Sequence, residues 1–439
     1  MTFEYVKPQR CIETRRPPWI DVTAPAAGRN RRCREINHRN CIRPLRLIDK
    51  PVTLLKIRLP SGKHTPGASG AIPPPGLGTN TQRTRSIMSR KIRVGINGFG
   101  RIGRLVARVM MERGNYEIVA VNDILDPKDF AGSVKQLAML FKYDSAHGPF
   151  KGTVEYNDTQ IIINGQATDV VSVKNPEELP WAKYGVDFVV ESTGVFRKRE
   201  QIEGHMKNGG VGRVLLTVPP KDAIDAIIVM GVNDADLKKE HKIISNASCT
   251  TNCLAPVVKV LHDRFGVVRG MMTTIHAYTN DQRILDQFHK SDMRRARSAA
   301  ANLIPTSTGA AKTIGKIITD LKGKLDGMAV RAPVQDGSLV DFVCELERIQ
   351  VREPAEMAAE INAAIKEAAN GAMKGILEYT EDPLVSQDIV HNPASSIYDA
   401  TSTMVMPNSR MVKILAWYDN EWGYSNRCVD LIEAAVALD

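Results

Sequence analysis

One stretch of this chain, residues 91–123, constrains the fold more than any other. Residues 91–97 form an apolar run typical of a buried strand, and the six residues after it read Gly-Phe-Gly-Arg-Ile-Gly. A helical pattern continues over residues 104–112, a second strand pattern covers 117–121, and Asp123 stands 20 residues after the last glycine. This order of strand, glycine turn, helix, strand and acid predicts the first βαβ unit of a doubly wound α/β sheet.

The three glycines of the turn have separate physical roles, which together suit a dinucleotide. Gly98 allows the tight turn, Gly100 lets the backbone approach a pyrophosphate, and Gly103 lets the helix pack closely on the strand. The pyrophosphate would then meet free N–H groups at the N-terminus of the helix. Asp123 can accept hydrogen bonds from both adenosine ribose hydroxyls and would repel a 2′-phosphate. The turn therefore predicts NAD as the cofactor.

More strand patterns extend this predicted sheet, and they end in small or hydroxyl residues. They cover residues 185–191, 213–216, 226–229 and 242–245. In a doubly wound sheet such strand ends, of which Thr217 is one, face the cofactor crevice. The same residue types also form ordinary turns, so this observation alone leaves both interpretations open.

Cys249 is the candidate nucleophile of the chain. It stands among small hydroxyl residues, and a helical pattern follows over residues 254–265, so the thiol is expected at or near a helix N-terminus. Pro256 suits the interior of a helix poorly, which favours a helix start up to one turn after the cysteine. Free N–H groups and the helix dipole would favour the thiolate, and Ser248 and Thr250 could help to hold an oxyanion or a phosphate. A buried structural thiol is the alternative.

His276 ends a strand pattern over residues 271–276 and is the candidate base. A lone histidine is more often structural, but a Cys–His pair is a known way to generate a nucleophile. Arginines at 294, 295 and 297 and the Thr308-Gly309 pair before an Ala-rich helix resemble anion-binding loops, although the arginines could equally form a solvated face. Arg331 lies within an apolar strand pattern and needs a partner, for which a phosphate is suitable.

The basic character of the chain belongs to residues 1–87. They contain 17 Lys and Arg against 5 Asp and Glu, a net charge of +12, so the remainder of the chain carries −2 of the total of +10. We therefore expect no specific nucleic-acid partner for the folded part. The Arg- and Pro-rich segment lacks sustained periodicity, which predicts a disordered leader. It could be a transit peptide, an interaction tail or an untranslated segment before a start at Met88, and we favour the last.

Composition excludes several other classes of protein. No apolar run approaches the roughly 18 residues of a membrane-spanning helix, so no membrane association is expected. The seven cysteines form no disulfide framework in a chain of this length, and they lack C-x-x-C zinc spacing. No metal site is predicted, and a reducing, cytoplasmic setting is expected.

Taken together, residues 89–439 closely resemble glyceraldehyde-3-phosphate dehydrogenase. The motifs that carry the resemblance are G-I-N-G-F-G-R-I-G-R, S-N-A-S-C-T-T-N-C-L-A-P, T-S-T-G-A-A-K and W-Y-D-N-E-W-G-Y. The resemblance implies a Rossmann NAD-binding domain over residues 88–248 and an α+β catalytic domain with a large mixed sheet over 249–423. It also implies that a C-terminal helix over 424–439 packs back on the first domain, and that the protein is a homotetramer.

The resemblance also implies roles for individual residues. Cys249 would be the nucleophile and His276 its base. Inorganic phosphate would bind to Ser248, Thr250, Arg295, Thr308 and Gly309. The C3 phosphate of the substrate would bind to Thr279, Asp281 and Arg331. The NAD site would comprise Gly98, Gly100, Arg101, Ile102, Gly103, Asp123, Lys174, Thr217 and Asn420, with Asn420 on the nicotinamide carboxamide.

The implied reaction is the phosphorylating oxidation of glyceraldehyde 3-phosphate to 1,3-bisphosphoglycerate with NAD, through a cysteine hemithioacetal and a thioester. Erythrose-4-phosphate dehydrogenase has a similar fold and cysteine and is the alternative within this class. Use of NADP as well as NAD also stays open. Gln287 and Phe288 stand where NAD-dependent members often have a small residue or Leu followed by Pro.

A protein that begins at Met88 keeps every motif named above. We expect it to fold and turn over substrate like the full chain, because residues 1–87 contain few apolar residues in periodic order. Both forms would be purified and compared in melting temperature and kcat/KM. A shorter form that aggregates or loses most of its activity would show that the leader is part of the fold.

Overall fold

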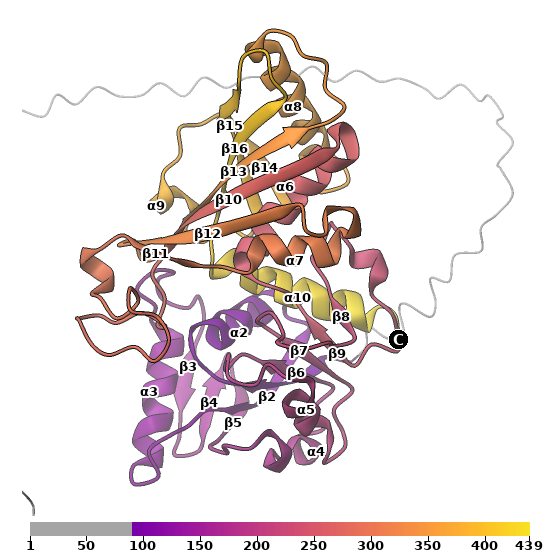
Figure 1. The fold of residues 1–439 in the computed structure, drawn as a ribbon. Coiled ribbons are helices and arrows are strands. Elements are labelled where there is room, and N and C mark those ends of the chain that lie inside the picture. The colour runs from indigo at the N-terminus through magenta and orange to yellow at the C-terminus, as the bar shows by residue number, and fades with distance from the viewer. Residues whose placement is uncertain (1–89) are drawn as a thin grey trace, which may run out of the picture. The chain divides into compact units, whose positions relative to one another are not determined.

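The computed structural model describes residues 90–439 (Figure 1). The predicted leader over residues 1–87 lies outside the described residues. Within residues 90–439 the chain builds two sheets, one of nine strands and one of seven. No helix in this part of the chain is both long and apolar enough to cross a membrane.

The first sheet has the doubly wound order β3-β4-β5-β2-β1-β6-β7-β9-β8. Its strands are β1 (Ile92–Asn97), β2 (Tyr116–Asn122), β3 (Val154–Tyr156), β4 (Gln160–Ile163), β5 (Gln166–Val171), β6 (Phe188–Glu191), β7 (Arg213–Leu216), β8 (Ala226–Ile227) and β9 (Ile243–Ser245). The pairings are parallel except for β3 with β4 and β4 with β5. Strand β1 lies between β2 and β6, so the chain order reverses there and opens the crevice in which this fold binds ligands.

The glycine turn is shaped by close approaches of the backbone. Gly98 has φ of +90°, and a Cβ there would lie 2.7 Å from the backbone nitrogen of Thr193. A Cβ on Gly103 would lie 2.1 Å from the carbonyl oxygen of Gly98, so only glycine lets this helix pack so closely on the turn. The helices of this domain are α2 (Arg101–Arg113), α3 (Phe130–Lys142), α4 (Trp181–Tyr184) and α5 (Arg199–Glu203).

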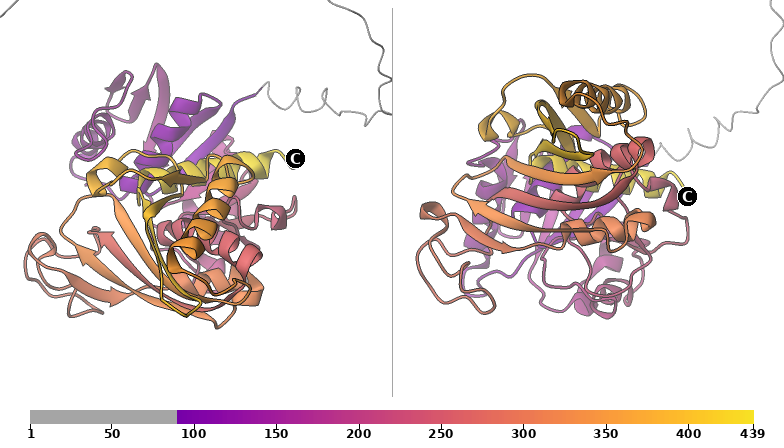
Figure 2. Two further views of the ribbon diagram at one scale, coloured as in Figure 1. Left: turned by 90° about the horizontal axis from the view of Figure 1, so that it is seen from above. Right: turned by 45° about the horizontal axis from the view of Figure 1, so that its top comes forward.

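The second sheet is mixed and has the order β11-β12-β10-β13-β16-β15-β14. Its strands are β10 (Val267–Ala277), β11 (Ile304–Ser307), β12 (Leu325–Ala332), β13 (Ser338–Leu346), β14 (Leu377–Thr380), β15 (Ser396–Val405) and β16 (Met411–Tyr418). Buried residues alternate along β13, so one face of the sheet forms a core. That face is covered by α6 (Cys249–Phe265), α7 (Ala310–Ile317) and α8 (Pro354–Asn370), as Figure 2 shows.

Short elements complete the domain connections. They are α9 (Ser386–Ile389) and the 3₁₀ turns η1 (Pro176–Glu178), η2 (Gly204–Met206), η3 (Asp234–Asp236), η4 (Ala299–Ala301) and η5 (Thr319–Leu321). The hairpin strands β3 to β5 and the long helix α8 were not predicted from the sequence patterns.

The last helix, α10 (Trp422–Val436), returns to the first domain and lies across the boundary between the domains (Figure 1). Its buried side chains, among them Leu431 and Ile432, join the same apolar cluster as β1 and α2. The C-terminal helix expected over residues 424–439 begins earlier than predicted, because α10 begins at Trp422. One oxygen of Asp419 accepts the backbone N–H groups of Glu421 (2.8 Å) and Trp422 (2.6 Å) and so starts the helix early.

We expect Leu431→Ala to lower the free energy of unfolding by about 2–5 kcal/mol, because it leaves a cavity in the core that joins α10 to the first domain. Leu438→Ala makes the same change at a side chain that is 42% exposed and is the matched control. Denaturant titration of both variants and the wild type measures the effect. Equal losses of unfolding free energy in the two variants would show that burying Leu431 against the first domain does not stabilise the fold.

Candidate active site

Cys249 is the first residue of α6, so the expectation of a later helix start is wrong. Ser248 is extended and caps the helix, since its hydroxyl accepts the N–H of Thr251 at 3.1 Å. Ala247 has φ of +56°, a left-handed conformation that turns the chain sharply between β9 and α6. Pro256 is buried inside the helix and does not interrupt it. The thiol therefore lies at a helix N-terminus and is half-buried.

His276 faces the thiol, with its Nε2 3.5 Å from Cys249 Sγ. Strand β10 carries His276 in register with Arg331 on the parallel strand β12. The His276 Nδ1 lies 2.7 Å from the carbonyl oxygen of Ala277 and 2.7 Å from Arg331 Nη1. These two contacts need opposite protonation states of Nδ1. When Nδ1–H donates to Ala277, Nε2 is free to accept a proton from Cys249, which is the tautomer that a base requires.

Burial at this site acts against the thiolate that was expected at Cys249 from the sequence. Burial and the charge of Arg331 lower the pKa of His276 to about 3. Burial raises the pKa of the Cys249 thiol, although Arg331 and hydrogen bonds from Thr250 act in the opposite direction. Both shifts favour a thiol and a neutral imidazole over a thiolate and an imidazolium in the free protein. The thiol proton must move to Nε2 when the sulfur attacks.

Tyr418 is a residue at this site that sequence reasoning missed. Its hydroxyl lies 2.9 Å from the hydroxyls of both Thr250 and Thr274, and its ring meets the His276 ring edge-on at 5.9 Å. The Thr250 hydroxyl is therefore engaged by Tyr418. The only sequence signal was an aromatic residue at the end of a strand pattern.

The two arginines predicted to bind anions, Arg331 and Arg295, differ in whether other side chains already pair with them. Arg331 is mostly buried, and its Nε has no hydrogen-bond partner among residues 90–439. Arg295 pairs with Asp281 and Asp292 and donates to Thr306 at 3.0 Å. Asp281 thus contacts Arg295 instead of Arg331. A buried guanidinium with an orphan donor is the arrangement that a bound phosphate would satisfy.

The remaining anion-site residues lie on loops. Thr308 accepts the N–H of Ala310 at 3.2 Å, and Gly309 caps α7 without a side chain, with open space where a Cβ would be. The backbone N–H of Thr279 donates to Gln282 at 3.2 Å. The start of α7 therefore has free N–H groups beside an uncrowded backbone, which suits an anion.

The predicted cofactor turn has the shape that a dinucleotide needs. Gly100 caps α2 with no side-chain hydrogen bond, and a Cβ there would meet nothing within 4 Å. Asp123 directly follows β2 and accepts the N–H of Phe99 at 2.9 Å and that of Ile124 at 2.8 Å. This ties the acid to the glycine turn at the carboxyl edge of the sheet, where ribose would lie. The residues present therefore fit NAD.

The other predicted cofactor residues stand at the same edge. The Arg101 guanidinium is held by Glu421 and Asp144, so its backbone N–H is what it can offer a phosphate. Thr217 follows β7 and donates to the carbonyl of Glu191 at 3.1 Å. The side-chain oxygen of Asn420, beyond β16, accepts from Ser338 at 2.5 Å. Ile102 lies in the first turn of α2, and Lys174 is exposed beyond β5.

Glu191 is a second residue that the sequence reading missed. It is fully buried at the end of β6 and accepts hydrogen bonds from Asn97 (2.6 Å), the backbone of Thr193 (2.9 Å) and His205 (2.9 Å). The Nδ1 of His205 accepts the indole N–H of Trp181 at 3.1 Å, so Nε2 carries the proton. The buried carboxylate thus fixes the ends of β1 and β6 beside the cofactor turn. The signal for Glu191 in the sequence was an acidic residue at the end of an apolar run.

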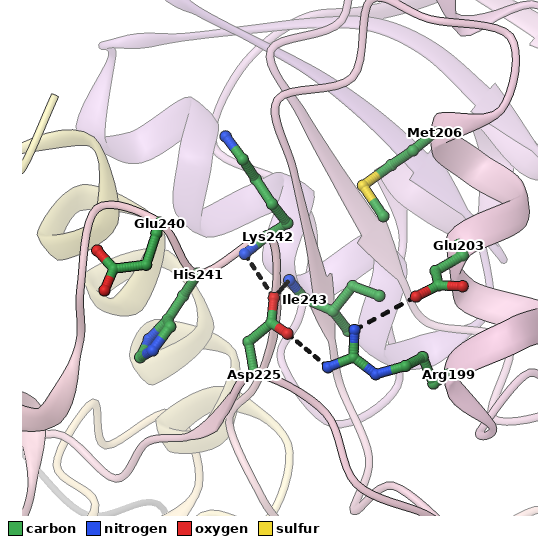
Figure 3. A pocket seen from close by; sticks show the side chains of 8 residues that line it. All are labelled: Arg199, Glu203, Met206, Asp225, Glu240, His241, Lys242 and Ile243. Atoms are coloured by element: carbon green, nitrogen blue, oxygen red, sulfur yellow. Dashed lines mark hydrogen bonds and ion pairs between the residues drawn. The ribbon is translucent and has the colours of Figure 1, made fainter.

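A surface pocket in the first domain is separate from this site (Figure 3). Its lining residues are Arg199, Glu203, Met206, Asp225, Glu240, His241, Lys242 and Ile243. None of the predicted site residues is among them. The Arg199 guanidinium is already paired with Asp225 and Glu203.

A doubly wound nucleotide domain joined to a mixed-sheet domain with a Cys–His pair is typical of dehydrogenases that use a dinucleotide and a cysteine. Residues 92–199 match the family model for the NAD binding domain of glyceraldehyde 3-phosphate dehydrogenase, and residues 248–420 match the model for its C-terminal domain. The chain therefore belongs to the glyceraldehyde-3-phosphate dehydrogenase family and is an NAD-dependent oxidoreductase.

Curated relatives support this membership along most of the chain. The glyceraldehyde-3-phosphate dehydrogenase of Borreliella burgdorferi is 51% identical over 350 residues, which cover 79% of this chain and all of the relative. The enzymes of Streptomyces coelicolor and Geobacillus stearothermophilus are 53% and 52% identical, and each match covers 77% of this chain and 97% of the relative.

We expect Asp123→Ala to relax the preference for NAD over NADP. The change removes a ribose hydrogen-bond acceptor and a charge that repels phosphate, an effect on the order of 1–3 kcal/mol. The ratio of kcat/KM values for the two cofactors measures it. An unchanged ratio would instead direct attention to Gln287 and Phe288, the latter 82% exposed.

Proposed function

We propose that this protein oxidises glyceraldehyde 3-phosphate to 1,3-bisphosphoglycerate with NAD and inorganic phosphate, and that Cys249 and His276 carry the chemistry. The observation that carries this proposal is the 3.5 Å contact between Cys249 Sγ and His276 Nε2 at the N-terminus of α6. The family membership and the names of the curated relatives support the same activity. Erythrose-4-phosphate dehydrogenase has no such support.

The first step joins Cys249 to the aldehyde. Sγ attacks the carbonyl carbon as its proton passes to His276 Nε2, and His276 then returns that proton to the carbonyl oxygen, which becomes the hydroxyl of a hemithioacetal. The neutral imidazole suits this role, because a proton acceptor must be unprotonated and its pKa is low in the free protein. Backbone N–H groups at the start of α6 can stabilise the developing oxyanion.

The second step leaves a thioester on Cys249. The cofactor turn would hold NAD, which would supply the acceptor for the hydride that leaves the hemithioacetal carbon. His276 takes the hydroxyl proton at the same time. Phosphate then attacks the thioester carbon, the C–S bond breaks, and the released sulfur regains a proton from His276. This sequence requires two anion sites beside one cysteine, one for the C3 phosphate and one for the attacking phosphate.

Two arginines of the catalytic domain, Arg295 and Arg331, are the basis of these anion sites. We assign the C3 phosphate to Arg331, whose Nε has no hydrogen-bond partner among residues 90–439. Thr279 and Asp281 are assigned to the same phosphate. The attacking phosphate belongs to Ser248, Thr250, Arg295, Thr308 and Gly309. Because Arg295 already pairs with Asp281, a phosphate there must share or displace that carboxylate. This makes the second site the weaker of the two.

The proposal extends to the assembly and setting of the protein. The segment 284–303 exposes Ile284, Leu285, Phe288, Met293 and Leu303, each between 67% and 89% exposed. Large apolar side chains gathered on one loop segment are typical of a subunit interface, which supports a homotetramer. The four cysteines in the described residues are all free thiols, which fits a reducing cytoplasm. We propose domain limits of 88–248 and 249–423, with residues 424–439 packed on the first domain.

We expect Cys249→Ser to abolish phosphorylating dehydrogenase activity while NAD still binds. A serine hydroxyl has far too high a pKa to act as a nucleophile at this site, even beside His276. Steady-state turnover and a cofactor-binding titration measure the two effects. Cys253→Ser is the matched control, since the same change one helical turn further leaves the thiol of Cys249 in place.

Loss of activity in both variants would indicate a general structural effect. A Cys249→Ser protein that keeps more than about a hundredth of the wild-type rate would remove Cys249 from its role, because general-base assistance alone gives roughly 10²–10⁴.

A further inference from the structure

A buried cluster of one imidazole and two carboxylates joins the domains outside the catalytic pair. His147 follows α3 in the first domain, Asp336 lies between β12 and β13, and Asp419 follows β16. One side-chain nitrogen or oxygen from each residue lies within 4.8 Å of the other two. The side chains are 1% exposed or less. Glu421 adds a further carboxylate oxygen 3.2 Å from His147 Nε2.

The negative charge of this cluster is not balanced by its neighbours. One oxygen of Asp336 accepts the N–H of Gly337, but Oδ2 accepts no hydrogen bond from any residue in 90–439 and faces His147 Nε2 at 3.4 Å. Arg101, the nearby guanidinium, is committed to Glu421 and Asp144. Buried carboxylates need a cation, a donor or a proton.

We propose that His147, Asp336 and Asp419, with Glu421 beside them, bind a divalent transition-metal ion that ties the two domains together. The unpartnered Asp336 oxygen points into the cluster and supplies a free ligand position. Carboxylate oxygens suit Mn²⁺, and an added imidazole nitrogen favours transition metals over Mg²⁺ and Ca²⁺. The ion takes no part in the reaction proposed for Cys249.

His391 gives the cluster a connection to solvent. It is exposed, and its Nδ1 lies 3.5 Å from Nδ1 of His147. Its ring also stacks on Trp422 at 4.1 Å. His391 can add a second imidazole nitrogen during entry.

The test is a titration of the full chain with Mn²⁺ after chelator treatment and dialysis, followed by electron paramagnetic resonance of the free ion. We expect one bound ion per chain and a higher melting temperature in its presence, because a ligand that binds the folded state stabilises it. Asp336→Asn should weaken binding by at least about tenfold. Asp158→Asn, at an exposed acid, is the matched control and should bind like the wild type.

Two further measurements keep the proposal falsifiable. Cys249→Ser must leave Mn²⁺ binding unchanged, since a lower stoichiometry would place the ion on the thiol. If Asp336→Asn does not fold, His147→Gln takes its place. The proposal is overturned if the wild type binds no Mn²⁺ at millimolar concentration, or if either cluster variant binds like the wild type. In that case a proton shared between Asp336 and Asp419 balances the charge.

Discussion

The structure depends on the junction between β9 and α6, where one side chain contacts the apolar cores of both domains. Cys249 packs against the apolar cluster of the first sheet and against that of the second, the only residue in the described part of the chain to do so. The left-handed turn at Ala247 makes this possible by sending the chain directly from the edge of one sheet into the helix that covers the other. A strained residue of this kind costs on the order of 1–3 kcal/mol, which the surrounding packing must offset.

Charge buried without full compensation recurs around this junction. Arg331 is mostly buried with an orphan Nε, and its charge helps to keep His276 neutral. Removing an arginine from water is expensive unless its donors are satisfied, so the free protein is poised for an anion. The same argument with opposite sign applies to Asp336, whose Oδ2 has no hydrogen-bond partner among residues 90–439. We propose a phosphate for the first region and a cation for the second.

The return of the chain to its first domain stabilises this arrangement. Helix α10 completes the apolar core of the nucleotide domain, and Asp419 fixes where the helix begins. Asn420 and Glu421 are thereby held between the two sheets, with Glu421 on Arg101 of the cofactor turn. The cofactor turn and the end of the catalytic domain are thus coupled through an ion pair as well as through packing.

Sequence alone determined the local features of this protein. The glycine turn, the strand β7, the acid after β2 and the cysteine before a helical pattern depend on residues close together in the chain, where periodicity and backbone preferences act directly. Tertiary structure decided the rest. The contacts of His276 with Arg331, of Thr250 with Tyr418 and of His147 with Asp336 join residues 55 to 189 positions apart. The hydrophobic periodicity of a sequence shows which face of a strand is buried. The packing of whole helices and strands decides which buried faces contact one another.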